Sequence, residues 1–97
     1  MPRHIHSMTT EQTRRVCAAV LALTRDWLLG QGAADGRYGG AAAFADFNRD
    51  CYVGIVKVEY SVAGGEAHDG EIEWRLDHRF EPVGEPDVRF SEGRRPL

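Results

Sequence analysis

Glu71 and Glu73 are the residues whose type and spacing come nearest to a catalytic pair. In a β-strand, residues two apart lie on one face, which would place the two carboxylates about 7 Å apart. Two carboxylates can act as acid and base when their surroundings push the two pKa values apart. Here Arg75 and Arg79 follow on the same face, and their guanidinium groups favour two ionised, solvated carboxylates. We therefore interpret these residues as part of a charged surface.

A thiol and an imidazole are available in Cys51 and His78, but they would form a catalytic pair only if the fold brought them together. His78 lies in phase with Trp74 along an apolar row, where a structural role is more typical. The His68–Asp69 pair falls in a segment typical of a hairpin loop. We therefore predict no catalytic residue, and an enzyme is the less favoured class of protein.

Phosphate, metal and cofactor sites are also disfavoured. The glycines of residues 30–36 miss the dinucleotide-binding spacing, follow a helical segment and lack a Gly-Lys-Ser/Thr ending. Cys17 and Cys51 do not have the spacing of zinc ligands. If Met1 were removed, residues 2–4 (Pro-Arg-His) would offer the nitrogen ligands that suit Cu(II) or Ni(II), an arrangement that also arises by chance. We predict no resident metal and no cofactor.

The strand that would carry the two glutamates spans residues 71–80 and alternates charged and apolar residues with period two. One face carries Glu71, Glu73, Arg75, Asp77 and Arg79, and the other carries Ile72, Trp74, Leu76, His78 and Phe80. A second strand, residues 52–62, has an apolar even face and an odd face that begins with Val53 and Ile55. A short third strand is predicted at Val88 and Phe90.

An amphipathic helix of about five turns is predicted to follow Thr9. Thr9 and Gln12 form a capping-box pattern, and Gly30 and Gly32 are typical of a helix end. The apolar face of the helix would consist of Val16, Cys17, Val20, Leu21, Leu23, Thr24, Trp27 and Leu28. This face is wide enough to cover one side of a small sheet.

The predicted elements specify an α+β fold. Residues 30–40, with five glycines, are expected to form a loop, and residues 41–48 a short second helix anchored by Phe44 and Phe47. The N-terminal helix, together with this short second helix, would pack on one face of a three-stranded antiparallel β-meander. Helix and sheet would then share a single core.

A chain of 97 residues, 42% hydrophobic and 28% charged, has room for one domain. We place this domain at residues 9–90, between a flexible leader of residues 1–8 and a flexible tail of residues 91–97. A domain of this size gains stability from dimerisation, so a homodimer stays open as an alternative to a monomer.

The net charge of −3 is unevenly distributed along the chain. Residues 1–49 carry six basic and four acidic residues, whereas residues 50–97 carry six basic and eleven acidic residues. An acidic half disfavours nucleic acid, whose phosphates need clustered Lys and Arg. Two cysteines without a disulfide framework favour a reduced, cytoplasmic setting, and Arg14–Arg15 lacks the apolar run and cleavage site of an export signal. No stretch approaches the ~18–20 apolar residues of a membrane span.

Two functions remain open. The first is a small non-enzymatic protein-binding module, such as an adaptor, an inhibitor or an immunity-type protein, that docks through the charged face of its sheet. Its candidate contact residues are Val53, Ile55, Glu71, Glu73, Arg75, Asp77 and Arg79. The alternative is a small ligand-binding protein or enzyme with a pocket between helix and sheet. That pocket would be lined by Trp27, Tyr60, Trp74 and His78.

Overall fold

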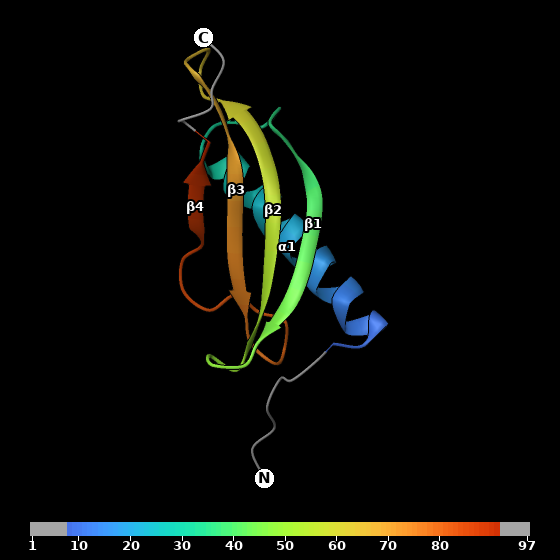
Figure 1. Cartoon of the computed structure of the whole chain (residues 1–97). Coiled ribbons are helices and arrows are strands. Elements are labelled where there is room, and N and C mark those ends of the chain that lie inside the picture. The colour runs from blue at the N-terminus through green and yellow to red at the C-terminus, as the bar shows by residue number, and fades with distance from the viewer. Residues whose placement is uncertain (1–7, 92–97) are drawn as a thin grey trace.

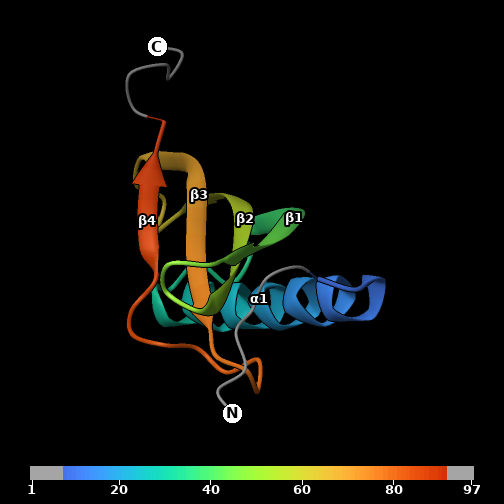
Figure 2. The same cartoon turned by 60° about the horizontal axis from the view of Figure 1, so that its bottom comes forward.

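One helix lies across one face of a four-stranded antiparallel sheet in the computed structural model, which describes residues 8–91. The elements are α1 (Thr10–Gly30), β1 (Arg37–Asp46), β2 (Cys51–Ser61), β3 (Ala67–Leu76) and β4 (Asp87–Phe90). The strands lie in chain order across the sheet, and α1 runs behind them (Figure 1). Figure 2 shows the same two layers from the side, with α1 beneath the sheet. The expected α+β fold is confirmed, with four strands in place of three.

The capping box predicted for α1 is confirmed. The Thr9 hydroxyl accepts the Gln12 backbone N–H at 3.0 Å, and the Gln12 side-chain oxygen accepts the Thr9 backbone N–H at 2.9 Å. The helix buries a stripe of residues four apart, which are Val16, Val20, Thr24 and Leu28. Among the described residues, no helix combines the length and the apolar character that crossing a membrane requires.

The expected second helix over residues 41–48 is wrong, because this segment contributes to β1 and to the turn that follows it. Alanine favours a helix by local propensity, but pairing with β2 and packing on α1 override this preference. The alternate side chains that pack toward the core are small, and they are Ala41, Ala43 and Ala45. An alanine-rich edge strand therefore lets the helix lie close to the sheet.

The hairpin loop predicted to contain His68 and Asp69, and the strand predicted at 71–80, both have different boundaries in the structure. β3 begins at Ala67, so His68 and Asp69 lie in the strand and not in a loop. The strand ends at Leu76 because the Asp77 carboxylate accepts the backbone N–H groups of Arg79 and Glu81, at 2.8 and 3.0 Å. This local turn competes with strand pairing and ends the alternation early.

Phe80 still reaches the core from within this turn, with a backbone φ of 65°. Its ring stacks on Tyr52 at a centroid distance of 5.1 Å, and the Arg15 guanidinium carbon lies 4.5 Å from the ring centroid. Phe80 therefore faces the core as predicted, but from a turn and not from a strand. The left-handed conformation, uncommon outside glycine, turns the side chain back onto the sheet.

The ends of the described chain contact the domain. Met8 is half-buried against the core, and the Ser91 backbone N–H donates to the Asp69 carbonyl at 2.7 Å. Residues 1–7 and 92–97 lie outside the described part of the chain, and with them most of the predicted leader and tail and the candidate copper or nickel ligands of residues 2–4.

The core depends on a close approach between α1 and the middle of β2. Val20 and Val56 are fully buried, and Gly54 lies directly beneath Val20. A Cβ added to Gly54 would lie 2.6 Å from the Val20 Cγ1, which is a steric overlap. Glycine at this position therefore sets the distance between helix and sheet. The buried cluster comprises Val16, Val20, Tyr52, Val56, Val58, Ile72, Trp74 and Leu76.

We predict that Gly54→Ala lowers the free energy of unfolding by about 1–3 kcal/mol, because the new methyl group overpacks against Val20. Urea denaturation followed by circular dichroism measures the loss. Gly39→Ala is the matched control in β1, where an added Cβ meets no atom within 4 Å. Combining Gly54→Ala with Val20→Ala should cost less than the sum of the two single changes. Additive losses would contradict the close-approach explanation.

Candidate interaction surface

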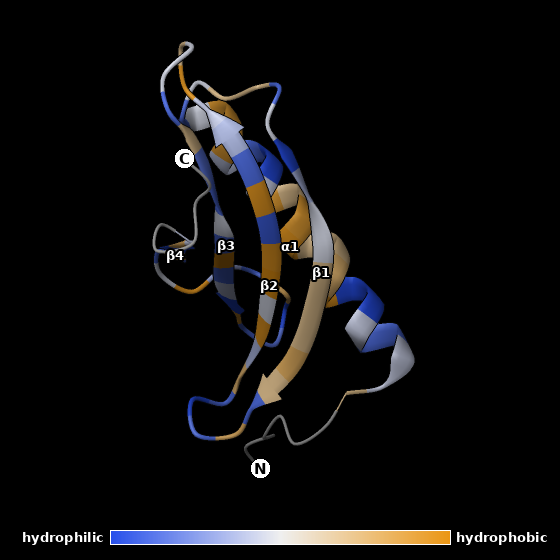
Figure 3. Cartoon of the chain, turned by 45° about the horizontal axis from the view of Figure 1, so that its top comes forward, coloured by the Kyte–Doolittle hydropathy of each residue, from blue (hydrophilic) through white to orange (hydrophobic). Residues whose placement is uncertain are grey.

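The sheet face that points away from α1 carries most of the residues expected to contact a partner, and we call it the outer face. Cross-strand partners share a face, so the strand registers define its rows of side chains. The rows are Phe44–Val53–Arg75, Ala42–Ile55–Glu73–Asp87, Lys57–Glu71–Arg89 and Arg37–Glu59–Asp69. The hydropathy colouring in Figure 3 shows the alternation along β2 that separates these residues from the core. One end of the outer face is apolar and the other is charged.

The apolar end lies on β1 and β2. Val53 is only 1% exposed although no helix lies over it. Its cross-strand neighbours Phe44 and Arg75 flank it on either side, and opposite side chains on one face lie about 5 Å apart at their Cβ atoms. Phe44 itself is 46% exposed, and Ile55 is half-buried. The apolar atoms that a partner could reach therefore belong mainly to Phe44 and Ile55.

Ion pairs between neighbouring strands order the charged part of the outer face. Arg75 pairs with Asp87 at 3.3 Å, and Arg89 pairs with Glu73 at 3.0 Å, so both pairs join β3 to β4. Arg37 pairs with Glu59 at 2.9 Å and joins β1 to β2. Exposed pairs of this kind contribute at most about 1 kcal/mol each to stability. Their main effect is to hold long side chains in fixed positions across the sheet.

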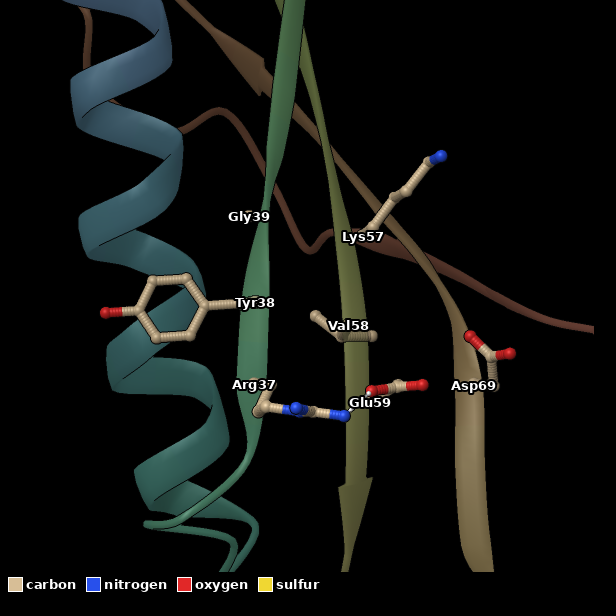
Figure 4. A pocket seen from close by; sticks show the side chains of 7 residues that line it. All are labelled: Arg37, Tyr38, Gly39, Lys57, Val58, Glu59 and Asp69. Carbon is tan, nitrogen blue, oxygen red and sulfur yellow. Dashed lines mark hydrogen bonds and ion pairs between the residues drawn. The ribbon is translucent and has the colours of Figure 1, made fainter.

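Two shallow grooves open on either side of Lys57 and Asp69. The first, of about 260 Å³, is lined by Arg37, Tyr38, Gly39, Lys57, Val58, Glu59 and Asp69 (Figure 4). The second, of about 390 Å³, is lined by Lys57, Asp69, Gly70, Glu71, Arg89, Phe90 and Ser91. In Figure 4 the Lys57 and Asp69 side chains point away from α1. The first groove exists partly because Gly39, which lies on the outer face, carries no side chain.

Five of the seven predicted contact residues come together on the outer face: Val53, Ile55, Glu71, Glu73 and Arg75. The other two, Asp77 and Arg79, lie in the turn after β3. The pKa of Asp77 is lowered because its carboxylate accepts the backbone N–H groups of Glu81 and Arg79. Asp77 therefore acts on the local backbone of the turn.

The four residues of the alternative pocket do not gather around one cavity. Trp27 and Tyr60 meet edge to face at a centroid distance of 5.6 Å, toward the end of the sheet where Tyr60 pairs with His68. His78 lies beyond the opposite end of β3, where its Nε2 is 3.2 Å from an Asp50 carboxylate oxygen. Trp74 is buried between them, in the core.

A buried hydrogen-bond chain accounts for the polar atom of Trp74. The Trp74 indole N–H donates to the Thr24 hydroxyl at 3.0 Å, and that hydroxyl donates to the Val20 carbonyl at 2.7 Å. Thr24 and Trp74 are both buried, so these bonds satisfy groups that have little access to water. The interface between helix and sheet is packed and internally satisfied around Trp74.

The described residues do not favour thiol or metal chemistry. Burial, and then the nearby Asp46 carboxylate, raise the pKa of the Cys51 thiol. A raised pKa leaves less thiolate at neutral pH and so opposes a nucleophilic role. Within residues 8–91, no group of three or more His, Cys, Asp or Glu side chains is placed to hold a metal ion.

Sequence reasoning missed the contribution of β1 to the outer face. It predicted a strand at Val88 and Phe90, which is β4, but it did not place Asp87 and Arg89 of this strand on the outer face. The local sequence predicts a helix at Ala42 and Phe44 and a loop at Arg37, whereas all three residues lie in β1. For β4, the alternation of Asp87, Val88, Arg89 and Phe90 was a usable signal, because it repeats the charged–apolar pattern of β3. Nothing local in the sequence indicates which charged residues of neighbouring strands lie opposite each other.

The lowered pKa of Asp77 predicts a pH dependence of stability. Its pKa in the folded state lies below the unfolded value of about 3.9, so its stabilising contribution is present above that value. The contribution is lost as the pH falls through the folded pKa. We predict that Asp77→Asn, which keeps an acceptor oxygen, weakens the decline of the urea midpoint below about pH 4. Asp35→Asn, in an exposed loop, should leave the native decline unchanged; an identical profile for both variants would contradict the prediction.

The Thr24–Trp74 hydrogen bond gives a second prediction. Thr24→Val keeps the shape of the side chain but leaves the indole N–H buried without a partner, which should cost about 1–3 kcal/mol of unfolding free energy. Thr24→Ser retains the hydroxyl and should cost less. Chemical denaturation of both variants measures the difference, and an equal or smaller loss for the valine variant would show that the bond contributes nothing.

Comparisons of the chain with models of protein families, with curated proteins and with solved structures found no match. A function is therefore inferred from the outer face and its chemistry.

Proposed function

We propose that this protein is a small non-enzymatic binding module that docks another protein through the outer face of its sheet. One observation carries the proposal. The exposed apolar atoms of Phe44 and Ile55 lie beside a set of charged side chains held in place by cross-strand ion pairs. An accessible apolar centre with an ordered polar border is the arrangement found in specific protein interfaces.

The charges of the outer face indicate the chemistry of the partner. Its rows and the adjacent Asp46 carry six acidic side chains and four basic ones. The basic groups Arg37, Arg75 and Arg89 are already engaged by carboxylates within the chain. We therefore expect a partner that presents an apolar side chain within a basic border, because opposite charges steer association and exclude wrong partners. The same balance disfavours nucleic acid.

Binding accounts for the outer face better than catalysis does. The Glu73 carboxylate forms an ion pair with Arg89, and the grooves beside Lys57 are open and shallow. An active site instead needs a group whose pKa is adjusted to its task inside a water-excluding pocket. Cys17 and Cys51 are free thiols, which supports the proposal that the protein works in a reduced, cytoplasmic setting.

We predict that the double variant Ile55→Thr, Glu71→Arg weakens partner binding by about tenfold or more, because it changes both an apolar contact and an acidic group of the outer face. The test is affinity capture from an extract of the native host, followed by titration of the captured protein. Threonine keeps the β-branched shape that suits a strand, so the fold should be retained.

The matched control makes the same types of change on the solvent side of α1, with Leu29→Thr and Asp26→Arg. Both residues are exposed, and both variants carry the same net charge. Circular dichroism and thermal unfolding check that the two variants stay folded. Retention of the partner by the control and its loss from the outer-face variant supports the proposal. Equal binding by both variants rules out the outer face as the docking surface.

A further inference from the structure

The two edges of the sheet differ in their protection against pairing with another strand. β4 has only four residues, follows Pro86 and carries Asp87 and Arg89. Short length, charge and proline are the usual means by which an edge strand avoids adding a further strand. Within residues 8–91, β1 forms the other edge with ten residues, and it has no charged residue or proline between Arg37 and Asp46. β1 does carry a bulge, which also disfavours pairing, but it is the longer edge and lacks charge along its centre, so it is the edge more open to pairing.

A bulge in β1 sets the phase of its two ends. The register with β2 slips by one residue between Gly39 and Ala42. Arg37 and Asp46 are nine residues apart, so in an unbroken strand they would lie on opposite faces. Because of the slip, their partners Glu59 and Cys51 are eight apart on β2, and both ends of β1 face the outer side.

This phase makes the edge complementary to itself. If two copies of β1 pair antiparallel about the middle of the strand, Arg37 of one copy lies opposite Asp46 of the other. The two-fold symmetry repeats this pair at both ends of the interface. In the same register Gly39 lies opposite Phe44 on the outer face, and Tyr38 lies opposite Ala45 on the helix face. An aromatic side chain opposite an edge glycine covers backbone that would otherwise be exposed. The two copies contribute equal numbers of residues between these positions, so both ends stay in register. At the centre, Ala41 faces the core and Ala42 faces the outer side, so the two bulges interrupt the regular pairing there.

We propose that β1 pairs with β1 of a second copy of this chain, so that two four-stranded sheets join into one. The Arg37 guanidinium uses one nitrogen on Glu59, its side chain is 83% exposed, and it has further N–H donors for a second carboxylate. One Asp46 oxygen accepts the backbone N–H groups of Asn48 and Arg49, and a carboxylate has further acceptor sites for the guanidinium of the second copy. Main-chain hydrogen bonds along the edge supply affinity, and the terminal charges select the antiparallel register.

The position of α1 fits this arrangement. The N-terminal turns of α1 extend past β1 in both Figure 1 and Figure 2. The helix passes β1 near its middle, where the Cys17 thiol lies 3.9 Å from the Ala41 carbonyl oxygen. In the paired sheet, these turns would lie beneath β1 of the second copy, and the reverse would hold for its helix. Each copy would therefore extend the helical layer of the other.

The pairing goes beyond the proposed function, because its main contact is the backbone edge of β1. It uses Phe44, Arg37 and Asp46 at the β1 side of the outer face, and it leaves Ile55, Glu71 and Glu73 open. Multi-angle light scattering over a dilution series of the full chain tests it. We expect a mass of twice 10.8 kDa at the high end of the series. Ala42→Lys should raise the dissociation constant about tenfold or more, because it places two like charges close to the two-fold axis. Ala42 is exposed, so the fold should be retained.

Ala22→Lys, at an exposed position of α1, is the matched control and should leave the dissociation constant unchanged. In addition, Ala42→Cys should form a disulfide between copies, because residues just across the two-fold axis lie within the range of disulfide geometry. Arg89→Cys on β4 should not. A mass of 10.8 kDa throughout the series would overturn the proposal. A dimer that persists in Ala42→Lys, or that cross-links equally through position 89, would place the interface elsewhere and overturn it as well.

Discussion

The close contact between Val20 and Gly54 is the constraint on which the rest of the structure depends. It seats α1 on the middle of β2 and fixes the distance between the two layers. One helix of 21 residues can cover only one face of a four-stranded sheet. Because α1 covers one face of the sheet, the opposite face is left in contact with solvent. The outer face exists because, within residues 8–91, a single helix packs against the sheet.

Strand register then gives the outer face its chemistry. Side chains two apart along each strand are brought beside those of the neighbouring strands, and carboxylates and guanidinium groups alternate across β3 and β4. The two glutamates that resemble a catalytic pair in the sequence become members of this network. Glu73 forms an ion pair with Arg89, and Lys57 lies directly opposite Glu71. An arrangement of paired charges beside exposed apolar atoms suits recognition of a surface better than chemistry on a small molecule.

The helix, the capping box and the inward residues of β2 and β3 follow from local patterns, and they were predicted correctly. The errors have physical causes. Residues 41–48 are rich in alanine, whose helix preference is smaller than the gain from adding a fourth strand to the sheet. The strand at 71–80 was predicted too long, because hydrogen bonds from the backbone to Asp77 end it at Leu76. The prediction that His78 lies on the apolar face of this strand is consequently wrong. His78 lies in the turn after β3, where its Nε2 is 3.2 Å from an Asp50 carboxylate oxygen.

By itself, the sequence determined which residues of each element face the core, because periods of 3.6 and 2 are local properties of the chain. It also determined that Glu71, Glu73 and Arg75 share a face. Only the tertiary structure decided that β1 is a strand, that Phe44 flanks Val53, and that Arg37 and Asp46 share one side of the sheet edge. These facts depend on register and on a single bulge. Pairing between segments distant in the sequence sets both, and no local periodicity encodes it.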